Sequence, residues 1–60
     1  MSLKGCRILI VDDEEDLLQM VAEAFEEEGC TVSTANNGED ALNIFLEKDI
    51  QVVIADESMP

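Results

Sequence analysis

Residues 8–13 read Ile-Leu-Ile-Val-Asp-Asp, an unbroken aliphatic run that ends in two acidic residues. Such a run is typical of a strand that is covered on both faces, as the strands of parallel sheets are. Residues 52–56, Val-Val-Ile-Ala-Asp, form a second run that ends in aspartate. Open α/β sheets bind ligands at the carboxyl edge of their parallel strands. If the two runs are neighbouring strands, three carboxylates meet at that edge, those of Asp12, Asp13 and Asp56.

The sequence that follows the first run has the pattern of a helix and then a strand. Residues 14–28 are expected to be helical, because apolar residues recur at helical spacing at Leu18, Val21, Ala22 and Phe25. Gly29 is suited to end this helix. Residues 31–35 are rich in β-branched residues and are expected to form a short second strand.

A second helix and a third strand are expected in the rest of the chain. Asn37 and Asp40 resemble a variant capping box at the start of that helix. Its apolar stripe is expected to consist of Ala41, Leu42, Phe45 and Leu46, and the helix to end near residues 48–49. Residues 50–55 then form the third strand.

This β-α-β-α-β alternation predicts an α/β fold with a parallel sheet. Right-handed crossovers on opposite faces give the strand order 2-1-3, which is the first half of the flavodoxin-like order. The first and third strands, which both end in aspartate, are then neighbours. Residues 7–60 are expected to form this unit. Residues 1–6 are a lead-in, and residues 1–3 are compatible with an expression-vector remnant.

The composition describes one small acidic domain. The chain has 60 residues, with 15 acidic and 3 basic side chains and a formal charge of −12. This charge argues against nucleic acid or an anionic membrane as a direct partner. The chain contains no apolar run of the roughly 18 residues that span a bilayer, and it does not begin like a signal peptide. A soluble, cytoplasmic location is expected.

The two cysteines, Cys6 and Cys30, each precede a predicted strand. A bridge between them is therefore geometrically conceivable. Two scattered cysteines in a chain without a secretory signal usually stay reduced, so we expect thiols. The chain has no histidine, and the cysteines do not have the spacing of a zinc site.

The three aspartates lack a compensating charge from the basic residues. Lys4, Arg7 and Lys48 all precede predicted strands and belong to the opposite edge of the sheet. Like charges about 4 Å apart repel by roughly 4 kcal/mol at an effective dielectric constant near 20. Such a cluster either raises a carboxyl pKa or recruits a cation, and an all-oxygen acidic site suits Mg²⁺. Taken singly, Asp12 and Asp13 fit a helix cap or a partner of the helix dipole better than a functional site, and Asp56 fits a turn former better.

Three segments together resemble the receiver domain of two-component response regulators: residues 8–15, residues 35–42 and the final stretch Asp56-Glu57-Ser58-Met59-Pro60. The resemblance begins at Arg7 and covers the N-terminal half of a receiver domain. It implies that Asp56 is the phosphoacceptor, which attacks the phosphohistidine of a sensor histidine kinase. It also implies that Asp13 ligates Mg²⁺ directly and that Asp12 acts mainly through metal-bound water.

The same resemblance assigns roles to the final residues. The backbone carbonyl of Ser58 is implied as a further Mg²⁺ ligand beside Asp56, and its side chain as a group that overhangs the acyl phosphate. Glu57, Met59 and Pro60 are implied to shape the loop.

The resemblance also implies two functional side chains that follow later strands of a full receiver domain. Receiver domains have a lysine after strand 5 and a serine or threonine after strand 4, and both would lie beyond Pro60. We therefore expect the 60-residue chain to bind Mg²⁺ weakly and to accept phosphate poorly. An open apolar edge on the strand of residues 50–55 is expected to cause homo-oligomerisation, by edge pairing or by exchange of elements.

Two other classes of function remain open at this stage. An aspartate-nucleophile phosphohydrolase is disfavoured, because those enzymes resemble a pattern with two aspartates two residues apart after the first strand, whereas this chain has Asp12-Asp13-Glu14. A dinucleotide-binding enzyme is disfavoured because no GxGxxG follows that strand. A structural or binding module that is not phosphorylated also fits. The leading reading is a phosphoacceptor in a signalling relay rather than a metabolic enzyme.

Overall fold

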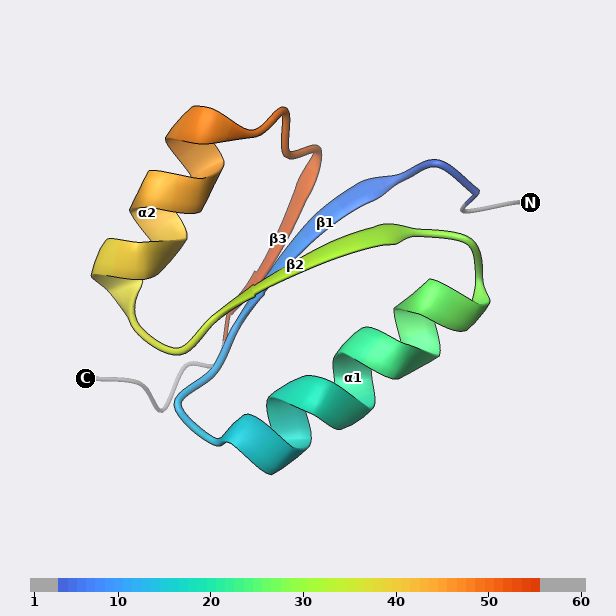
Figure 1. Cartoon of the computed structure of the whole chain (residues 1–60), viewed down its shortest axis with the longest axis horizontal. Coiled ribbons are helices and arrows are strands. Elements are labelled where there is room, and N and C mark those ends of the chain that lie inside the picture. Colours follow the sequence, from blue (N-terminus) through green and yellow to red (C-terminus); the bar gives the residue numbers. More distant parts are fainter. Residues whose placement is uncertain (1–3, 56–60) are drawn as a thin grey trace.

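The computed structural model describes residues 4–55, and these form a three-stranded sheet with one helix on each face (Figure 1). The elements are β1 (Arg7–Val11), α1 (Glu15–Glu27), β2 (Thr31–Ala35), α2 (Gly38–Glu47) and β3 (Val52–Ala55). All strands are parallel and their order is β2-β1-β3. The predicted α/β class, flavodoxin-like element order and sheet order are confirmed.

The strand register aligns the carboxyl ends of all three strands. Val11 at the end of β1 pairs with Ala35 of β2 on one side and with Ala55 of β3 on the other. The chain therefore leaves every strand at one edge of the sheet, which we call the carboxyl edge. The opposite edge, where the strands begin, is the amino edge.

The two faces of the sheet carry separate hydrophobic clusters. On the α1 face, Ile8 and Ile10 pack with Leu18, Ala22 and Cys30. On the α2 face, Leu9, Val11 and Ala35 form the buried cluster, against which the half-buried side chains of Ala41, Ile44 and Ile50 pack. Because successive side chains of a strand point to opposite faces, the aliphatic run of β1 supplies both clusters. The helical stripe predicted for α1 is confirmed.

The helix ends follow the local sequence signals. Gly29 follows the C-cap of α1 with a positive φ of 92°, and its N–H donates to the carbonyl of Glu26. Asn37 caps α2, since its side-chain oxygen accepts the N–H of Asp40 at 2.8 Å. The Asp40 carboxylate in turn accepts a hydrogen bond from the Asn37 side-chain amide at 3.0 Å. The predicted capping pair is therefore present, and its second hydrogen bond joins the two side chains.

Two boundaries differ from the prediction. The third strand begins at Val52 rather than at residue 50, because the N–H of Ile50 turns back to the carbonyl of Lys48. The first helix begins one residue later than residue 14, with Glu14 as its N-cap, and Glu28 is its C-cap.

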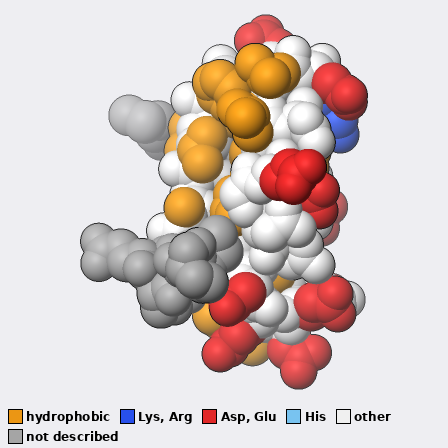
Figure 2. Space-filling model, turned by 90° about the vertical axis from the view of Figure 1, so that its left-hand side faces the viewer, with side chains coloured by type: hydrophobic (Ala, Val, Ile, Leu, Met, Phe, Trp, Pro, Cys, Tyr) orange, Lys and Arg blue, Asp and Glu red, His pale blue; other side chains and the backbone are white. Residues whose placement is uncertain are grey.

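The apolar stripe predicted for the second helix is only partly correct. Ala41 packs on the sheet as expected, and Ile44 also contacts it. Leu42, Phe45 and Leu46 are 57%, 48% and 72% exposed, because the narrow sheet ends at β3 and covers only part of α2. Figure 2, which faces the α2 side, shows hydrophobic side chains gathered on the upper part of this surface.

All three basic residues lie toward the amino edge, as predicted. Arg7 opens β1 and pairs with Asp49, with 2.9 Å between its guanidinium nitrogen and the carboxylate. Lys48 caps the end of α2, and its ammonium group reaches the Ser33 hydroxyl at 3.3 Å. Lys4 lies beside Gly29, just before the strands begin.

Candidate functional site

The two aspartates that follow β1 lie at the carboxyl edge and differ in exposure. Asp12 is buried, with 7% of its surface exposed, whereas Asp13 is exposed. The N–H of Asp12 continues the ladder by donating to the carbonyl of Ala35 at 3.1 Å. Its carboxylate accepts the N–H of Glu14 at 3.0 Å. Asp12 is thus fixed by backbone groups on both sides, between the end of β2 and the start of α1.

The third predicted carboxylate, Asp56, lies outside the described residues, together with Glu57, Ser58, Met59 and Pro60. Its position in the sequence is informative all the same. Ala55, which precedes Asp56, is the register partner of Val11, which precedes Asp12. Hence β1 and β3 are adjacent and end level with one another, as the sequence predicted.

Asp12 and Asp13 are chemically suited to a hard divalent cation. A carboxylate offers about four lone-pair sites, and the bond from Glu14 uses one of those on Asp12. Within residues 4–55, however, no group of three or more acidic or thiol side chains is close enough together to hold a metal ion. Asp12 and Asp13 alone therefore do not make up a Mg²⁺ site, and the remaining predicted ligands, Asp56 and Ser58, lie outside the described residues.

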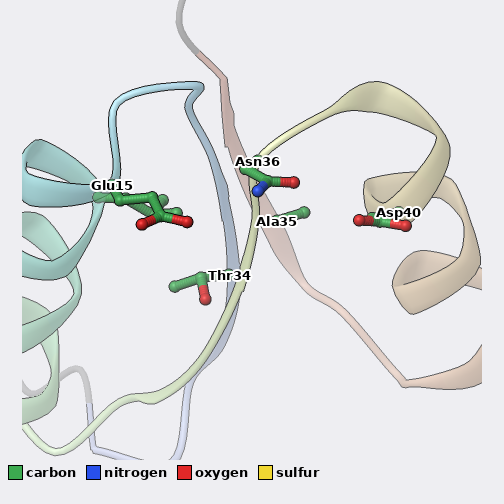
Figure 3. A pocket seen from close by; sticks show the side chains of 6 residues that line it. Glu15, Thr34, Ala35, Asn36 and Asp40 are labelled. Atoms are coloured by element: carbon green, nitrogen blue, oxygen red, sulfur yellow. The ribbon is translucent and has the colours of Figure 1, made fainter.

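A shallow pocket of about 270 Å³ lies at the same edge, over the end of β2 (Figure 3). It is lined by Glu15, Leu18, Thr34, Ala35, Asn36 and Asp40. Figure 3 shows Glu15 and Thr34 on one side of the end of β2 and Asp40 on the other. This pocket was not predicted from the sequence. The signal for it was available, since Glu15 and Asp40 both open helices that begin at the carboxyl edge.

The carboxyl edge carries no basic side chain among residues 4–55. The three basic residues of the chain all lie toward the amino edge, where Arg7 pairs with Asp49, and the Lys48 ammonium group reaches Ser33 in the middle of β2. Figure 2 shows acidic side chains grouped at the lower end of the molecule. The electrostatic field at the carboxyl edge is therefore negative, which favours a bound cation and opposes an anion.

Comparison with known proteins identifies the family to which this α/β sheet belongs. Residues 8–60 match the response regulator receiver domain. The chain is similar to the regulatory protein AtoC of Escherichia coli (strain K12), with 44% identity over 54 residues, which is 90% of this chain and 12% of AtoC. It is also similar to the response regulator SaeR of Staphylococcus aureus (strain USA300), with 40% identity over 53 residues, which is 88% of this chain and 23% of SaeR.

The chain therefore belongs to the response regulator receiver domain family. This family consists of signalling domains of two-component systems rather than metabolic enzymes. The chain spans less than a quarter of the length of the two relatives named above. In the described part of the chain, neither helix is long and apolar enough to cross a membrane.

Proposed function

We propose that this chain takes part in phosphorelay signal transduction, with Asp56 as the residue that accepts a phosphoryl group. A carboxylate oxygen of Asp56 attacks the phosphorus of a phosphohistidine on a sensor histidine kinase, and the histidine nitrogen leaves. Residues 7–60 are the receiver segment, and residues 1–6 are a lead-in to it.

The observation that supports this proposal best is the pairing of β1 with β3. Val11 and Ala55 are partners in the parallel ladder, and each is followed at once by aspartate in the sequence. The register therefore aligns the two strand ends that precede Asp12 and Asp56 in the sequence. The family match over residues 8–60 includes all of these positions.

Mg²⁺ is the proposed cofactor. Asp13 and Asp56 would bind it through their carboxylates, Asp12 mainly through metal-bound water, and Ser58 through its backbone carbonyl. When bound, the ion neutralises the charge that builds up during phosphoryl transfer. Asp12 is held in position by the N–H of Glu14 and by its own bond to Ala35, so its carboxylate is oriented before the ion arrives. Glu57, Met59 and Pro60 would shape the loop.

We propose further that the 60-residue chain by itself binds Mg²⁺ weakly and is phosphorylated poorly. Three aspartates and one Mg²⁺ leave a net charge of −1, and a phosphoryl dianion makes this more negative. The basic residues of the chain lie toward the other edge of the sheet, where Arg7 pairs with Asp49. Without a cation beside the phosphoryl group, transfer lacks part of its electrostatic stabilisation.

We propose a protein partner in the cytoplasm, and the charge of the chain agrees with a partner that is not a polyanion. A formal charge of −12 opposes direct binding to nucleic acid or to an anionic membrane. We propose that the kinase is the physiological partner and that this segment contacts neither DNA nor lipid.

The test is phosphorylation by acetyl phosphate with and without Mg²⁺, followed by intact-mass measurement of the 60-residue chain. We expect a minor fraction with one phosphoryl adduct, present only with Mg²⁺ and absent in Asp56→Asn. The matched control is Asp49→Asn, an aspartate toward the amino edge that is 86% exposed, which should retain the adduct. An adduct that persists in Asp56→Asn contradicts the assignment of the phosphoacceptor, and complete conversion contradicts the proposed weakness.

Mg²⁺ binding is measured separately, by following backbone amide resonances during a Mg²⁺ titration. We expect the shifts to concentrate at Asp12 and Asp13 and to weaken strongly in Asp13→Asn. Equal shifts at Asp49, toward the other edge, would indicate diffuse binding to the acidic surface and would contradict a specific Mg²⁺ site at the carboxyl edge.

A second proposal concerns self-association through β3. The sheet has two open edges, and they differ in chemistry. The exposed residues of β2 are Thr31 and Thr34, whereas β3 exposes Val52 and Val53 at 43% and 49%. An apolar groove lies beside β3, lined by Leu9, Gly38, Ala41, Leu42, Phe45 and Val53. Apolar open edges are templates for pairing with another chain.

Sedimentation of the wild-type chain and of two lysine variants tests this second proposal. Val53→Lys places a charge in the groove, and Met20→Lys places the same charge on α1, at a site that is already 65% exposed. We expect the wild type and Met20→Lys to form dimers or larger species, and Val53→Lys to shift toward the monomer. A wild-type chain that stays a folded monomer at micromolar concentration contradicts the proposal.

A further inference from the structure

The two cysteines of the chain lie side by side at the amino edge, on neighbouring strand ends. The N–H of Thr31 donates to the carbonyl of Cys6 at 2.8 Å, and the register of β1 with β2 begins one residue later, with Arg7 opposite Thr31. Continued back by one position, this register puts Cys6 opposite Cys30. Neighbouring strands lie about 4.8 Å apart, which is inside the range of about 4.4–6.8 Å between Cα atoms that a disulfide requires.

The two side chains also point to the same face of the sheet. Cys30 belongs to the buried cluster under α1, together with Ile8 and Leu18. Cys6 is half-buried and packs against that same cluster. Residues opposite one another in a ladder share a face, so both sulfur atoms lie between the strand ends and α1. Neither residue is disulfide-bonded in the structure.

The two thiols differ in their access to solvent. Cys6 is half-buried and can meet a small reagent, whereas Cys30 is only 7% exposed. Burial raises the pKa of the Cys30 thiol, and the nearby Cys6 and Glu28 raise it further. Cys6 is thus the thiol suited to react first, and Cys30 the one suited to react second, from within the protein.

We propose that Cys6 and Cys30 form a reversible intramolecular disulfide when the chain meets a small-molecule disulfide of the glutathione type. This reaction is independent of the phosphoacceptor function. It takes place at the amino edge, at the opposite end of β1 from Asp12.

The reaction is a thiol–disulfide exchange in two steps. The Cys6 thiolate attacks one sulfur of the small disulfide, whose S–S bond breaks, and the first small thiolate leaves and takes up a proton. Cys30 then loses its proton to solvent, and its sulfur attacks the Cys6 sulfur of the mixed disulfide. The second small thiolate leaves and is protonated. Overall, two protein thiols are oxidised to one disulfide, and one small disulfide is reduced to two thiols.

The new bond would tie the start of β1 to the start of β2 and would enclose α1 in a covalent loop. Such a loop restricts the unfolded chain and so stabilises the fold. The oxidised chain should therefore unfold at a higher urea concentration than the reduced chain.

The test equilibrates the reduced chain with mixtures of oxidised and reduced glutathione, blocks the remaining thiols with iodoacetamide, and measures intact mass. We expect a monomer that is lighter by two hydrogen atoms, that carries no added group, and that dithiothreitol returns to the reduced mass. A chain that carries glutathione on both cysteines, or a covalent dimer as the main product, would overturn the proposal.

The same titration in urea separates pairing that is directed by the fold from chance pairing in a short chain. We expect the unfolded chain to need a ratio of oxidised glutathione to the square of reduced glutathione that is at least about tenfold higher, which for this two-electron couple is about 30 mV. Equal ratios with and without urea would overturn the proposal. Cys30→Ser should stop at the mixed disulfide on Cys6, and a Cys30→Ser chain that gains no glutathione where the wild type is oxidised would also overturn it.

Discussion

Gly29 joins α1 to β2 with a positive φ of 92°, in close contact with the chain that leads into β1. A Cβ atom at this position would lie 3.1 Å from the backbone Cα of Lys4. The same short connection carries the bond from the Gly5 N–H to the Gly29 carbonyl. Backbone conformation and close packing therefore both require glycine here.

We expect Gly29→Ala to lower the free energy of unfolding by about 1–3 kcal/mol, because the left-handed conformation strains alanine and its methyl group meets Lys4. Gly38→Ala is the matched control. Gly38 opens α2 with open space around its Cα, so alanine there should be neutral or stabilise by up to about 1 kcal/mol. Urea denaturation followed by circular dichroism measures both, and equal effects would contradict the argument.

The Cys30 thiol gives the fold a defined dependence on alkaline pH. Its pKa lies above the ordinary value of 9.0, mainly through burial. The folded chain thus keeps this proton at a pH where the unfolded chain releases it. The resulting contribution to stability is complete below pH 9.0 and is lost as the pH rises through the raised pKa.

We expect the urea midpoint to be lower above pH 9.0 than below it, and this decrease to be smaller in Cys30→Ala. Cys6→Ala keeps the buried thiol, so it should retain most of the fall. Midpoints are compared under reducing conditions. An identical alkaline fall in wild type and Cys30→Ala would show that other groups are responsible.

At the scale of elements, β1 supports the whole sheet. It pairs with both other strands and supplies the buried aliphatic side chains of both faces. Leu9, at its centre, is only 1% exposed. By contrast, α2 has no fully buried residue, and Leu46 is 72% exposed.

We expect Leu9→Ala to cost about 2–5 kcal/mol, because it leaves a cavity in the α2-face cluster. A core in a chain of this size rarely supplies more than about 3–5 kcal/mol, so this variant should be largely unfolded at room temperature. Leu46→Ala, on the exposed side of α2, should change stability by no more than about 0.5 kcal/mol. Circular dichroism distinguishes the two, and a folded Leu9→Ala would contradict this view of the core.

The sequence predicted these elements well wherever a local signal coincided with burial. The run of residues 8–11 specified β1, the spacing of Leu18 and Val21 specified the buried face of α1, and Asn37 fixed the start of α2. The stripe on α2 was harder to predict. Its periodicity marks an apolar face, but how much of that face is covered depends on the width of the sheet, which no local pattern encodes.

The candidate site was predictable to the extent that it depends on topology. Aspartates follow both the run of residues 8–11 and the run of residues 52–55. Because the strand order makes these two runs neighbours, Asp12 and Asp13 were expected at the carboxyl edge, next to the end of β3. The pocket between Glu15 and Asp40 was not predicted from the sequence, because acidic residues at helix starts are commonly caps or partners of the helix dipole. Which acidic side chains line one pocket depends on how two separate helices approach β2.

At the scale of the whole molecule, the net charge and the exposed apolar surface have opposite effects on self-association. Copies of a chain with a formal charge of −12 repel one another, whereas the exposed side chains of β3 and α2 favour contact. Salt screens the repulsion and leaves the apolar contribution in place.

We therefore expect self-association to strengthen as sodium chloride is raised from about 0.1 M to about 1 M, where the Debye length falls from about 10 Å to about 3 Å. Sedimentation velocity at fixed protein concentration measures the change. Dissociation with added salt would mean that ion pairs, rather than β3 and α2, hold the copies together.

The parallel arrangement of β1 between its neighbours also bears on how the molecule resists force. The chain enters β1 at the amino edge and leaves β3 at the carboxyl edge, so a pull on the two ends runs along the strands. The hydrogen bonds between β1 and β3 are then loaded together in shear instead of being opened one after another. We expect optical-tweezer traces with a single rupture, at a higher force than when the molecule is pulled through Arg7 and Thr31, which are partners at the same end of their ladder.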